Sequence, residues 1–540
     1  MDKKIAQLVA DEFGIDVEIK LTRPDPQFGD YATNVALQIA KQVGKNPREI
    51  AVRLMEKLQQ SREYQKVSIA GPGFINITLG AKDLLAQLHL QSKKDRDGVK
   101  VVIETNNPNP FKAMHIGHAF NATLADTIAN LIEADGAETH RVSYHGDVGL
   151  HVGKSMYSLL RYVAGDISRL EAIPVDERNT FMSQMYAEGS KAYKEDEAAK
   201  AEVDQLARES FAPASDIYRQ VYETCKAWSF EQIDVIVTRL GNKPTERRFL
   251  ESEADARGVE TVKQHVPDVF QESDGALVFA GSKYGAFDNA FVAGNGRGLY
   301  GARDLGLMQL KNEAYHAQKS YVVTGEEQRD YFRGVIAAAE LAIPELKGVT
   351  VNISTGLVKL TTGKMSSREG DVIEIGWLFD QFKQAIEARG GDPTDEIAAG
   401  AMRYQFLKVK IGSDVVFDIN EAVSLQGNTG SYLQYAHARA RSILTKVQAG
   451  ELTEVREEDR TLVRKLGGYN DVLGRAKTEL QPHLLSQYLF ELAQEFNRYY
   501  EVNQVAGNEF EAHRAALVRT YAETLGRGLN LLGIAAPEKM

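Results

Sequence analysis

The stretch at residues 99–136, VKVVIETNNPNPFKAMHIGHAFNATLADTIANLIEADG, decides the fold of this chain. Residues 99–105 (VKVVIET) form a nearly continuous apolar run, which is typical of a strand buried in a parallel sheet. An Asn/Pro-rich loop follows at 106–110, and a helix is predicted from about Gly117 to Asp135, where Gly136 is a natural stop. Strand, loop and helix in this order predict the opening of a doubly wound α/β domain with a parallel, Rossmann-like sheet.

The residues after this stretch predict the remainder of the same domain. Further strands are predicted at 276–280, 321–324 and 349–354, and we expect them to complete the same sheet. Residues 155–260 are predicted to be mostly helical, as an insertion in the α/β domain. Within it, the stretch 191–209 is rich in Ala, Lys, Glu and Asp, and we interpret it as a solvated helix face.

The two ends of the chain have different patterns. Near the N-terminus, a helix is predicted at 50–58, with Asn46 as its cap and Pro47 in its first turn. Residues 67–79 (VSIAGPGFINITL) are interpreted as strand, turn and strand. Toward the C-terminus, apolar residues recur at helical spacing, namely Leu485, Leu489, Leu492 and Phe496, then Leu517, Tyr521, Leu525 and Leu529. We therefore predict an α+β domain at 1–95, the α/β domain at 98–395 with its insertion around 155–260, and an all-helical domain at 396–540.

Composition limits the classes of protein that the chain can represent. Its 540 residues are 43% hydrophobic and 26% charged, as in ordinary globular proteins. The net charge of −11 argues against coating nucleic acid through bulk charge, although local basic patches stay possible. The one cysteine, Cys225, excludes an internal disulfide and a Cys-rich zinc site, and it favours a reducing, cytoplasmic compartment. The polar start lacks the apolar core of a signal peptide, and we identify no membrane segment.

The first motif with chemical meaning is His115-Ile116-Gly117-His118, at the predicted start of the helix. Backbone N–H groups at a helix start attract phosphate, and glycine lets a flat base or a phosphate approach the backbone. Two imidazoles one turn apart can hydrogen-bond the phosphates of a nucleotide. Two other interpretations stay open: ordinary capping or core histidines, or half of a metal site.

The second motif is GKMSSREG, from Gly363 to Gly370. Glycines flank a short cationic segment with two hydroxyl groups, as in a flexible loop that grasps phosphate. The alternative is an exposed turn without a ligand.

Together, the two motifs form the arrangement that is typical of class I aminoacyl-tRNA synthetases, and the chain resembles the arginyl-tRNA synthetase family closely. Supporting segments include FGDYATN at 28–34, NPREIA at 46–51 and AGPGFIN at 70–76, which resemble the tRNA-contacting N-terminal domain of that family. The segments QYAHAR at 434–439, LAQEFN at 492–497 and LLGIAAPE at 531–538 resemble its helical anticodon-binding domain. The resemblance is weakest over about 155–290.

The resemblance implies an arginine–tRNA ligase. L-arginine would be activated by ATP, entering as its magnesium complex, and then transferred to the terminal adenosine of tRNA(Arg). No tightly bound metal, no membrane contact, a monomer and a cytoplasmic location are expected. The implied catalytic residues are Lys112, His115, His118 and Lys364. The implied ATP-binding residues are His115, Gly117, His118, Lys364, Met365, Ser366, Ser367 and Arg368.

Arginine recognition needs carboxylates that accept the guanidinium fork. Glu104 ends the first strand, where ligand sites of α/β sheets form and where an idle charge is costly to bury. Asp304 matches a family position that binds the guanidinium; the alternative is a local salt bridge between Asp304 and Arg303. The implied arginine-binding set is Glu104, Asn107, Asn109, Tyr300, Asp304 and Gln328. The segment 324–330 is expected to line the pocket, but its Gly325–Gln328 part is atypical.

The chain departs from the family pattern at several positions. Class I loops commonly have a second lysine where this chain has Ser367, and Lys112 is expected to substitute for the missing charge; the alternative is an ordinary surface lysine. Val148 stands where the family usually has Trp, and Leu150 and His151 replace usual polar partners. Packing near the adenosine or the tRNA end is therefore expected to differ.

Three other functions have different requirements. A different class I synthetase would need zinc-ligating cysteines or a cationic pocket in place of Glu104 and Asp304. A small-molecule nucleotidyltransferase would not need the two RNA-type terminal domains. A non-catalytic tRNA-binding synthetase paralogue would not need an intact His115, Gly117, His118 and Lys364.

Overall fold

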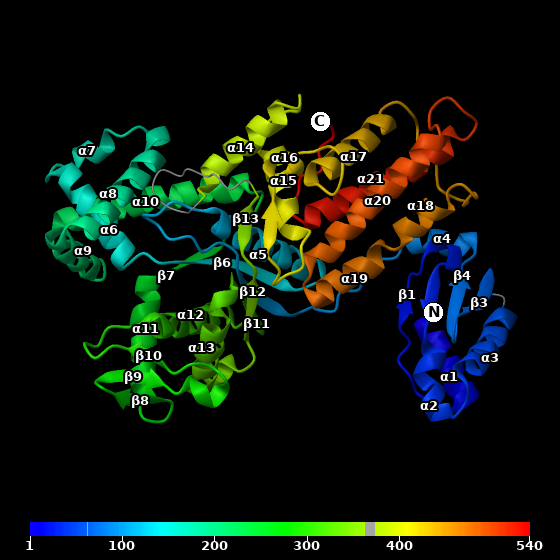
Figure 1. Cartoon of the computed structure of the whole chain (residues 1–540), viewed down its shortest axis with the longest axis horizontal. Helices are drawn as coiled ribbons and strands as arrows, with labels where there is room; N and C mark the ends of the chain where they lie inside the picture. The colour runs from blue at the N-terminus through cyan, green and yellow to red at the C-terminus, as the bar shows by residue number, and fades with distance from the viewer. Residues whose placement is uncertain (62, 362–372) are drawn as a thin grey trace.

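A five-stranded parallel sheet forms the centre of the molecule. The computed structural model describes residues 1–61, 63–361 and 373–540. The strands β5 (Lys100–Glu104), β6 (Glu138–His145), β7 (Arg247–Leu250), β11 (Lys319–Gly325) and β12 (Thr350–Thr355) lie in the order β12-β11-β5-β6-β7, and all are parallel (Figure 1). The chain changes direction across the sheet between β5 and β11, and α/β sheets bind ligands at such a switch point. The predicted doubly wound α/β class is confirmed.

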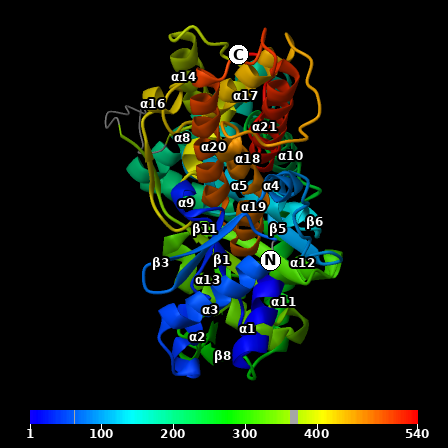
Figure 2. The same cartoon turned by 90° about the vertical axis from the view of Figure 1, so that its right-hand side faces the viewer.

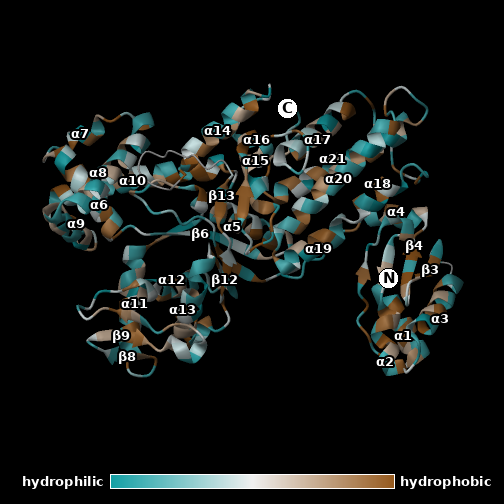
Figure 3. Ribbon diagram, in the orientation of Figure 1, coloured by the Kyte–Doolittle hydropathy of each residue, from teal (hydrophilic) through white to brown (hydrophobic). Residues whose placement is uncertain are grey.

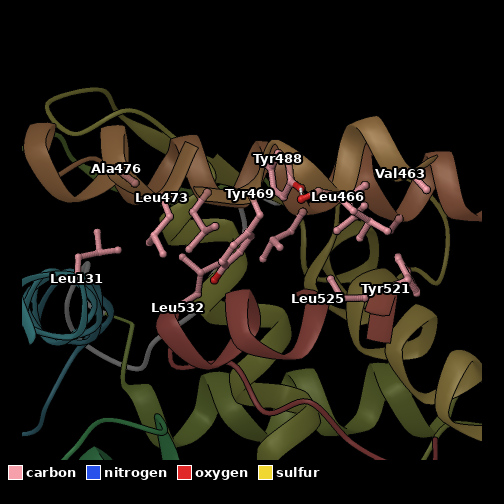
Figure 4. Packing of buried hydrophobic residues seen from close by; sticks show 14 of the residues in the cluster. Leu131, Val463, Leu466, Tyr469, Leu473, Ala476, Tyr488, Tyr521, Leu525 and Leu532 are labelled. Atoms are coloured by element: carbon pink, nitrogen blue, oxygen red, sulfur yellow. Dashed lines mark hydrogen bonds between the residues drawn. The ribbon is translucent and has the colours of Figure 1, made fainter. Parts of the chain in front are cut away.

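Helix α5 (Ile116–Ala134) follows β5 as predicted, and it is buried on nearly all sides. One side covers the sheet, and the other contacts the C-terminal helices, where Leu131 reaches the cluster drawn in Figure 4. A helix covered on both sides needs small and apolar residues all round, which explains the run of Ala, Leu and Ile in its sequence.

The prediction that residues 276–280 belong to the central sheet is wrong. They form β9 (Ala276–Phe279), the middle strand of a separate antiparallel sheet with β8 (Phe270–Ser273) and β10 (Asn289–Val292). The turn before β9 explains the difference: Asp274 and Gly275 both have positive φ, of 49° and 79°. An Asp-Gly pair in this conformation connects two antiparallel strands in a tight hairpin.

The stretch 155–260 is mostly helical, as predicted, but it also contributes β7 to the central sheet. The crossover from β6 to β7 contains α6 (Leu150–Val163), α7 (Ser168–Glu171), α8 (Arg178–Glu195), α9 (Glu197–Glu209) and α10 (Asp216–Arg239), at the left of Figure 1. After β7, the chain continues through α11 (Glu251–Gln264), α12 (Tyr300–Tyr315) and α13 (Arg329–Ala342). Strand β7 has only four residues and lies between the long helices α10 and α11. The helical periodicity on both sides therefore gave no separate signal for a strand.

The N-terminal unit has its own antiparallel sheet, in the order β1-β2-β4-β3. Its elements are α1 (Asp2–Phe13), β1 (Leu21–Thr22), β2 (Tyr31–Thr33), α2 (Val35–Val43), α3 (Pro47–Gln60), β3 (Lys66–Ala70), β4 (Phe74–Thr78) and α4 (Ala81–Leu88). The predicted cap is confirmed, since the side chain of Asn46 accepts a hydrogen bond from the N–H of Arg48 at 2.9 Å. The predicted hairpin is confirmed as β3 and β4, with Gly71 at φ 54° in the turn. Figure 3 shows α3 with both hydrophilic and hydrophobic residues, as expected for a helix with one face in water.

The C-terminal part is a bundle of helices that packs against α5. It contains α14 (Ile375–Glu387), α15 (Asp395–Leu407), α16 (Ile419–Ala422), α17 (Gly430–Leu444), α18 (Arg460–Gly467), α19 (Tyr469–Glu479), α20 (Pro482–Val502) and α21 (Glu511–Leu531). The apolar residues predicted for α20 and α21 are all buried, which confirms both helices. One strand, β14 (Val415–Phe417), interrupts the helical region and pairs with β13 (Val358–Leu360).

The N-terminal unit is attached to the C-terminal helices through ion pairs. The buried Asp30 accepts a hydrogen bond from Arg460 at 2.8 Å, and Arg23 bonds Asp471 at 2.8 Å. Figures 1 and 2 both place this unit below α18. The FGDYATN motif therefore has a structural part to play, because its Asp30 ties β2 to helix α18.

Candidate active site

A cavity of about 520 Å³ lies at the carboxyl end of the central sheet, where β5 and β11 separate. Ligand cavities of proteins usually have volumes of about 300–1,000 Å³, so this one can hold a small substrate. It brings together predicted residues from three separate stretches of the sequence, 104–118, 300–304 and 328. The predicted residues that line it are Glu104, Asn107, Asn109, His118, Tyr300, Asp304 and Gln328.

The two histidines of the first motif cap the start of α5. The Nδ1 of His115 accepts a hydrogen bond from the backbone N–H of His118, and the Nδ1 of His118 accepts one from the N–H of His115. The rings stack with their centroids 3.6 Å apart and an angle of 22° between their planes. A Cβ atom on Gly117 would lie 3.1 Å from the ring of His115, so the glycine leaves room for this stack.

Both histidines are neutral at physiological pH. Burial lowers the pKa of His115 to about 4, and the nearby positive charge of Lys112 adds to the effect. Burial, His115 and Lys112 lower the pKa of His118 to about 3. Because each Nδ1 accepts a backbone N–H, the remaining ring proton must be on Nε2. Each imidazole is therefore a fixed donor at a helix start, which is suited to a phosphate oxygen.

Lys112 lies outside the main cavity. Its exposed side chain lines a neighbouring cavity of about 190 Å³, between the active-site loop and helices α8 and α10. Burial is the main cause of the lowered pKa of both histidines, and the positive charge of Lys112 is a smaller one.

Asp304 forms the acidic wall of the cavity. It lies on α12 and accepts a hydrogen bond from the hydroxyl of Tyr331, on α13. Burial is the main cause that raises the pKa of Asp304 to about 7, with smaller contributions from the negative charges of Glu104 and Glu251. The alternative salt bridge with Arg303 is not formed, because Arg303 turns the other way and pairs with Glu251 and Asp255.

Both carboxylate oxygens of Glu104 have hydrogen-bond partners within the protein. One carboxylate oxygen accepts a hydrogen bond from the ammonium of Lys311 at 2.5 Å, and the other accepts one from the Nδ2 of Asn107 at 2.6 Å. The Oδ1 of Asn107 accepts a hydrogen bond from the backbone N–H of Tyr144 at 2.8 Å, so both the oxygen and the nitrogen of its side-chain amide are bonded. Asn109 accepts the N–H of Gly146 at 2.9 Å. Asn107 and Asn109 therefore hold the loop after β5 against β6 and the residues that follow it.

Sequence reasoning missed several residues that line the cavity, namely Thr105, Asn106, Asn121, Tyr144, Lys311 and Tyr331. Within the described part of the chain, the buried Thr105 hydroxyl and the side-chain carbonyl of Asn106 have no hydrogen-bond partner. Buried polar atoms usually have partners, so these two atoms are suited to a bound substrate. Thr105 and Asn106 could have been predicted from the sequence, because they directly follow Glu104. The sequence around Lys311 shows only that it lies in a helix and does not indicate a role in the site.

Three residues that depart from the family pattern, Val148, Leu150 and His151, follow β6 in the chain. Val148 is buried, with 2% of its surface exposed, and Leu150 is exposed. His151 contacts the carbonyl of Gly146 at 2.7 Å, and burial lowers the pKa of His151 to about 4. An apolar side chain therefore fills the position of the usual Trp, and His151 bonds the backbone.

The second motif, including Lys364, Met365, Ser366, Ser367 and Arg368, lies outside the described residues. The residue that follows the gap, Ile373, accepts a hydrogen bond from the N–H of Ile116 at 2.9 Å. Ile375 donates to the carbonyl of Met114 at 3.1 Å. The chain thus returns from this segment directly beside the histidine pair.

No group of three or more His, Cys, Asp or Glu side chains among the described residues is placed to hold a metal ion. No helix among them is long and apolar enough to cross a bilayer.

Three family models match consecutive parts of the chain. The arginyl-tRNA synthetase N-terminal domain matches residues 1–79, the catalytic domain of class I (R) tRNA synthetases matches 81–418, and the DALR anticodon binding domain matches 433–540. The catalytic model alone matches more than half of the chain.

Relatives and solved structures agree with these models over the whole length. An arginine–tRNA ligase from Cyanothece sp. is 30% identical over 95% of this chain and 94% of that protein. One from Clostridium botulinum is 28% identical over 98% and 97%. The arginyl-tRNA synthetase structure from Thermus thermophilus has a TM-score of 0.82 at 24% identity and covers 100% of this chain and 99% of that one. The chain therefore belongs to the class I arginyl-tRNA synthetase family.

Proposed function

We propose that the chain activates L-arginine with ATP and transfers the arginyl group to tRNA(Arg), with the residues described above in specific roles. The chain is an arginine–tRNA ligase. The observation that carries the assignment of roles is a single cavity lined both by the neutral donor His118, at the start of α5, and by the partly buried acid Asp304. The donor suits a polyphosphate, and the acid suits a guanidinium.

In the first step, a carboxylate oxygen of arginine attacks the α-phosphorus of ATP, and the bond from that phosphorus to the β-phosphate bridging oxygen breaks. Arginyl-adenylate and pyrophosphate are formed. The Nε2–H groups of His115 and His118 donate to phosphate oxygens, and Gly117 allows the nucleotide to approach the backbone. No protein nucleophile is needed, because positioning and charge stabilisation account for most catalysis of phosphoryl transfer.

Cations neutralise the charge that develops on the leaving pyrophosphate. We assign this role to Lys112 and to Lys364, with Met365, Ser366, Ser367 and Arg368 completing the ATP-binding loop. The hydrogen bond between Ile116 and Ile373 supports this assignment, because it brings the chain next to the histidines just after that loop. ATP enters as its magnesium complex, in which the phosphates themselves are the main ligands of the ion.

At the other end of the cavity, Asp304 accepts the guanidinium of the substrate, and the Tyr331 hydroxyl orients its carboxylate. Tyr300, of which 73% is exposed, lies at the mouth and covers the bound substrate together with Gln328. Glu104, Asn107 and Asn109 shape the floor. A site that pairs a buried acid with a guanidinium rejects amino acids without one by a large factor, so a proofreading domain is not required.

In the second step, a ribose hydroxyl of the terminal adenosine of tRNA attacks the carbonyl carbon of arginyl-adenylate, and AMP leaves. We assign tRNA contacts to the N-terminal unit and to the C-terminal helices, in which the family models for these two domains match. We further propose that the protein acts in the cytoplasm as a monomer.

The test is ATP–pyrophosphate exchange across the amino acids, with and without tRNA(Arg). We expect exchange with arginine, and only when tRNA is present. Exchange with a different amino acid would contradict the arginine specificity. Tight tRNA binding without exchange under any condition would instead support the non-catalytic paralogue.

A further inference from the structure

A buried ion pair lies in the wall of the cavity between the sheet and α12. The ammonium of Lys311 is 2.5 Å from a carboxylate oxygen of Glu104, and only 3% and 2% of the two side chains are exposed. Lysine is among the residues that are hardly ever fully buried without a partner. A lysine in the wall of a site for a cationic substrate therefore needs an explanation.

The charges around the cavity supply one. Among the described residues that line it, the acids are Glu104 and Asp304, and Lys311 is the cation that accompanies them. His118 is neutral, since its pKa is lowered to about 3. One positive and two negative charges leave the wall with a net charge of −1, which matches the single net positive charge of arginine. Without Lys311 the same wall would hold two uncompensated acids.

We propose that Lys311 is a positioning residue for arginine recognition: it binds Glu104 and thereby leaves the charge of Asp304 for the guanidinium. This inference rests on the proposed function, since it concerns the same site. Lys311 acts in two ways. It holds the Glu104 carboxylate, and with it Asn107 and the loop after β5, in one orientation. It also cancels the negative charge that Glu104 would otherwise direct at Asp304.

The second effect is measurable, because two like charges in one site raise the pKa of each other. The groups that act on Asp304 come from every element around it: Tyr331 on α13, Glu104 on β5, Glu251 on α11, Lys311 on α12 and Tyr144 on β6. Glu104 and Glu251 raise the pKa of Asp304, whereas Lys311 and the hydrogen bond from Tyr331 lower it. Loss of the lysine charge alone must therefore shift the ionisation of Asp304 to higher pH.

The experiment measures kcat/KM for arginine in the tRNA-dependent exchange reaction between pH 6 and pH 9.5. If ionised Asp304 binds the guanidinium, kcat/KM rises with pH through the pKa of Asp304 and then reaches a plateau. In Lys311→Met we expect the midpoint to move up by about one pH unit, so that KM for arginine rises about tenfold below the midpoint and returns toward the wild-type value near pH 9. In Lys311→Arg, which keeps the charge, the midpoint stays in place. Lys347→Met, at an exposed lysine, is the matched control and leaves the profile unchanged.

Glu104→Gln and the double variant Glu104→Gln/Lys311→Met complete a double-mutant cycle. Glu104→Gln leaves the lysine charge unopposed, so the midpoint moves to lower pH. The double variant removes both charges, and its midpoint returns to near the wild-type value even if KM itself is altered. If Lys311→Met does not fold, Glu104→Gln and the double variant still test the same shifts.

A purely structural role for Lys311 would raise KM by the same factor at every pH, and this result would overturn the inference. The same holds if the midpoint is equal in all variants while the wild type activates arginine. If the wild type itself activates no arginine, the proposed function fails first, so the two failures are distinguishable.

Discussion

Substitution of Arg403 by methionine should weaken the packing of helix α5 against the C-terminal bundle and lower the free energy of unfolding. The side chain of Arg403 is fully buried on α15. Its guanidinium donates to the carbonyl of Leu532 at 3.0 Å, to the carbonyl of Leu240 at 2.9 Å and to the carboxylate of Asp126 at 3.2 Å. It thus joins the last turn of the bundle, the end of the helical crossover and the middle of α5.

The expected cost follows from these contacts. Removing one partner of a buried ion pair costs about 3–5 kcal/mol, and the lower end applies because Arg141 still bonds Asp126 at 3.2 Å. Each of the two carbonyls that lose a donor adds about 1 kcal/mol. Methionine fills most of the volume, so the cavity left behind adds little. We expect a loss of about 5 kcal/mol in the free energy of unfolding, which is a large part of the total stability of a typical protein.

The assay is native-state hydrogen exchange combined with urea unfolding. In Arg403→Met, protection should fall in α5 and in residues 529–534, and the N-terminal unit should keep its protection. Arg441→Met is the control, since Arg441 pairs with Glu538 at the surface, with 36% of its side chain exposed, and should cost under about 1 kcal/mol. A change under about 1.5 kcal/mol in Arg403→Met, or a loss of protection spread evenly over the chain, would refute the reasoning.

Four further predictions concern the site. Asp304→Asn should lower kcat/KM for arginine by about 10²–10³-fold, because a buried partner of the guanidinium loses its charge. KM for ATP should stay nearly unchanged. If the variant keeps the wild-type kcat/KM for arginine, Asp304 does not belong to the recognition site. In the wild type, kcat/KM for arginine should rise with pH around the Asp304 pKa of about 7, and this limb should be absent in Asp304→Asn. His118→Ala should slow adenylate formation by about 10²–10³-fold in single-turnover measurements, through the loss of one phosphate donor, and an equal loss at the tRNA-transfer step alone would contradict this role. Lys112→Ala should strongly impair adenylation. Its thermal unfolding should equal that of the wild type, because the side chain is exposed. An unchanged adenylation rate would mean that Lys112 is an ordinary surface lysine.

Local sequence predicted much of the fold because the signals were strong and short-ranged. The apolar run of β5, the small and apolar residues of α5 and the helical spacing in α20 and α21 each constrain one element without reference to the others. The error at 276–280 has a local cause as well: a run of apolar residues alone does not distinguish a parallel strand from an antiparallel one, whereas the Asp274-Gly275 turn before it does.

The histidine pair could be assigned to the start of α5 from its position alone. Its neutral state and the position of its protons could not, because they depend on burial and on the reciprocal hydrogen bonds of the cap. The same holds for Glu104. Its location at the end of β5 was predicted, but its partner Lys311 lies 207 residues away in the chain, and no pattern connects the two.

By itself, the sequence determined the family and the order of most main elements, and it predicted a set of site residues, since motifs and periodicity are properties of neighbouring residues. Only the tertiary structure decided that Glu104 is paired with a lysine, that Asp304 accepts a hydrogen bond from a tyrosine, and which ionisable groups are neutral. The physical reason is that charge state depends on desolvation and on groups from other elements, and these meet only when the chain has folded.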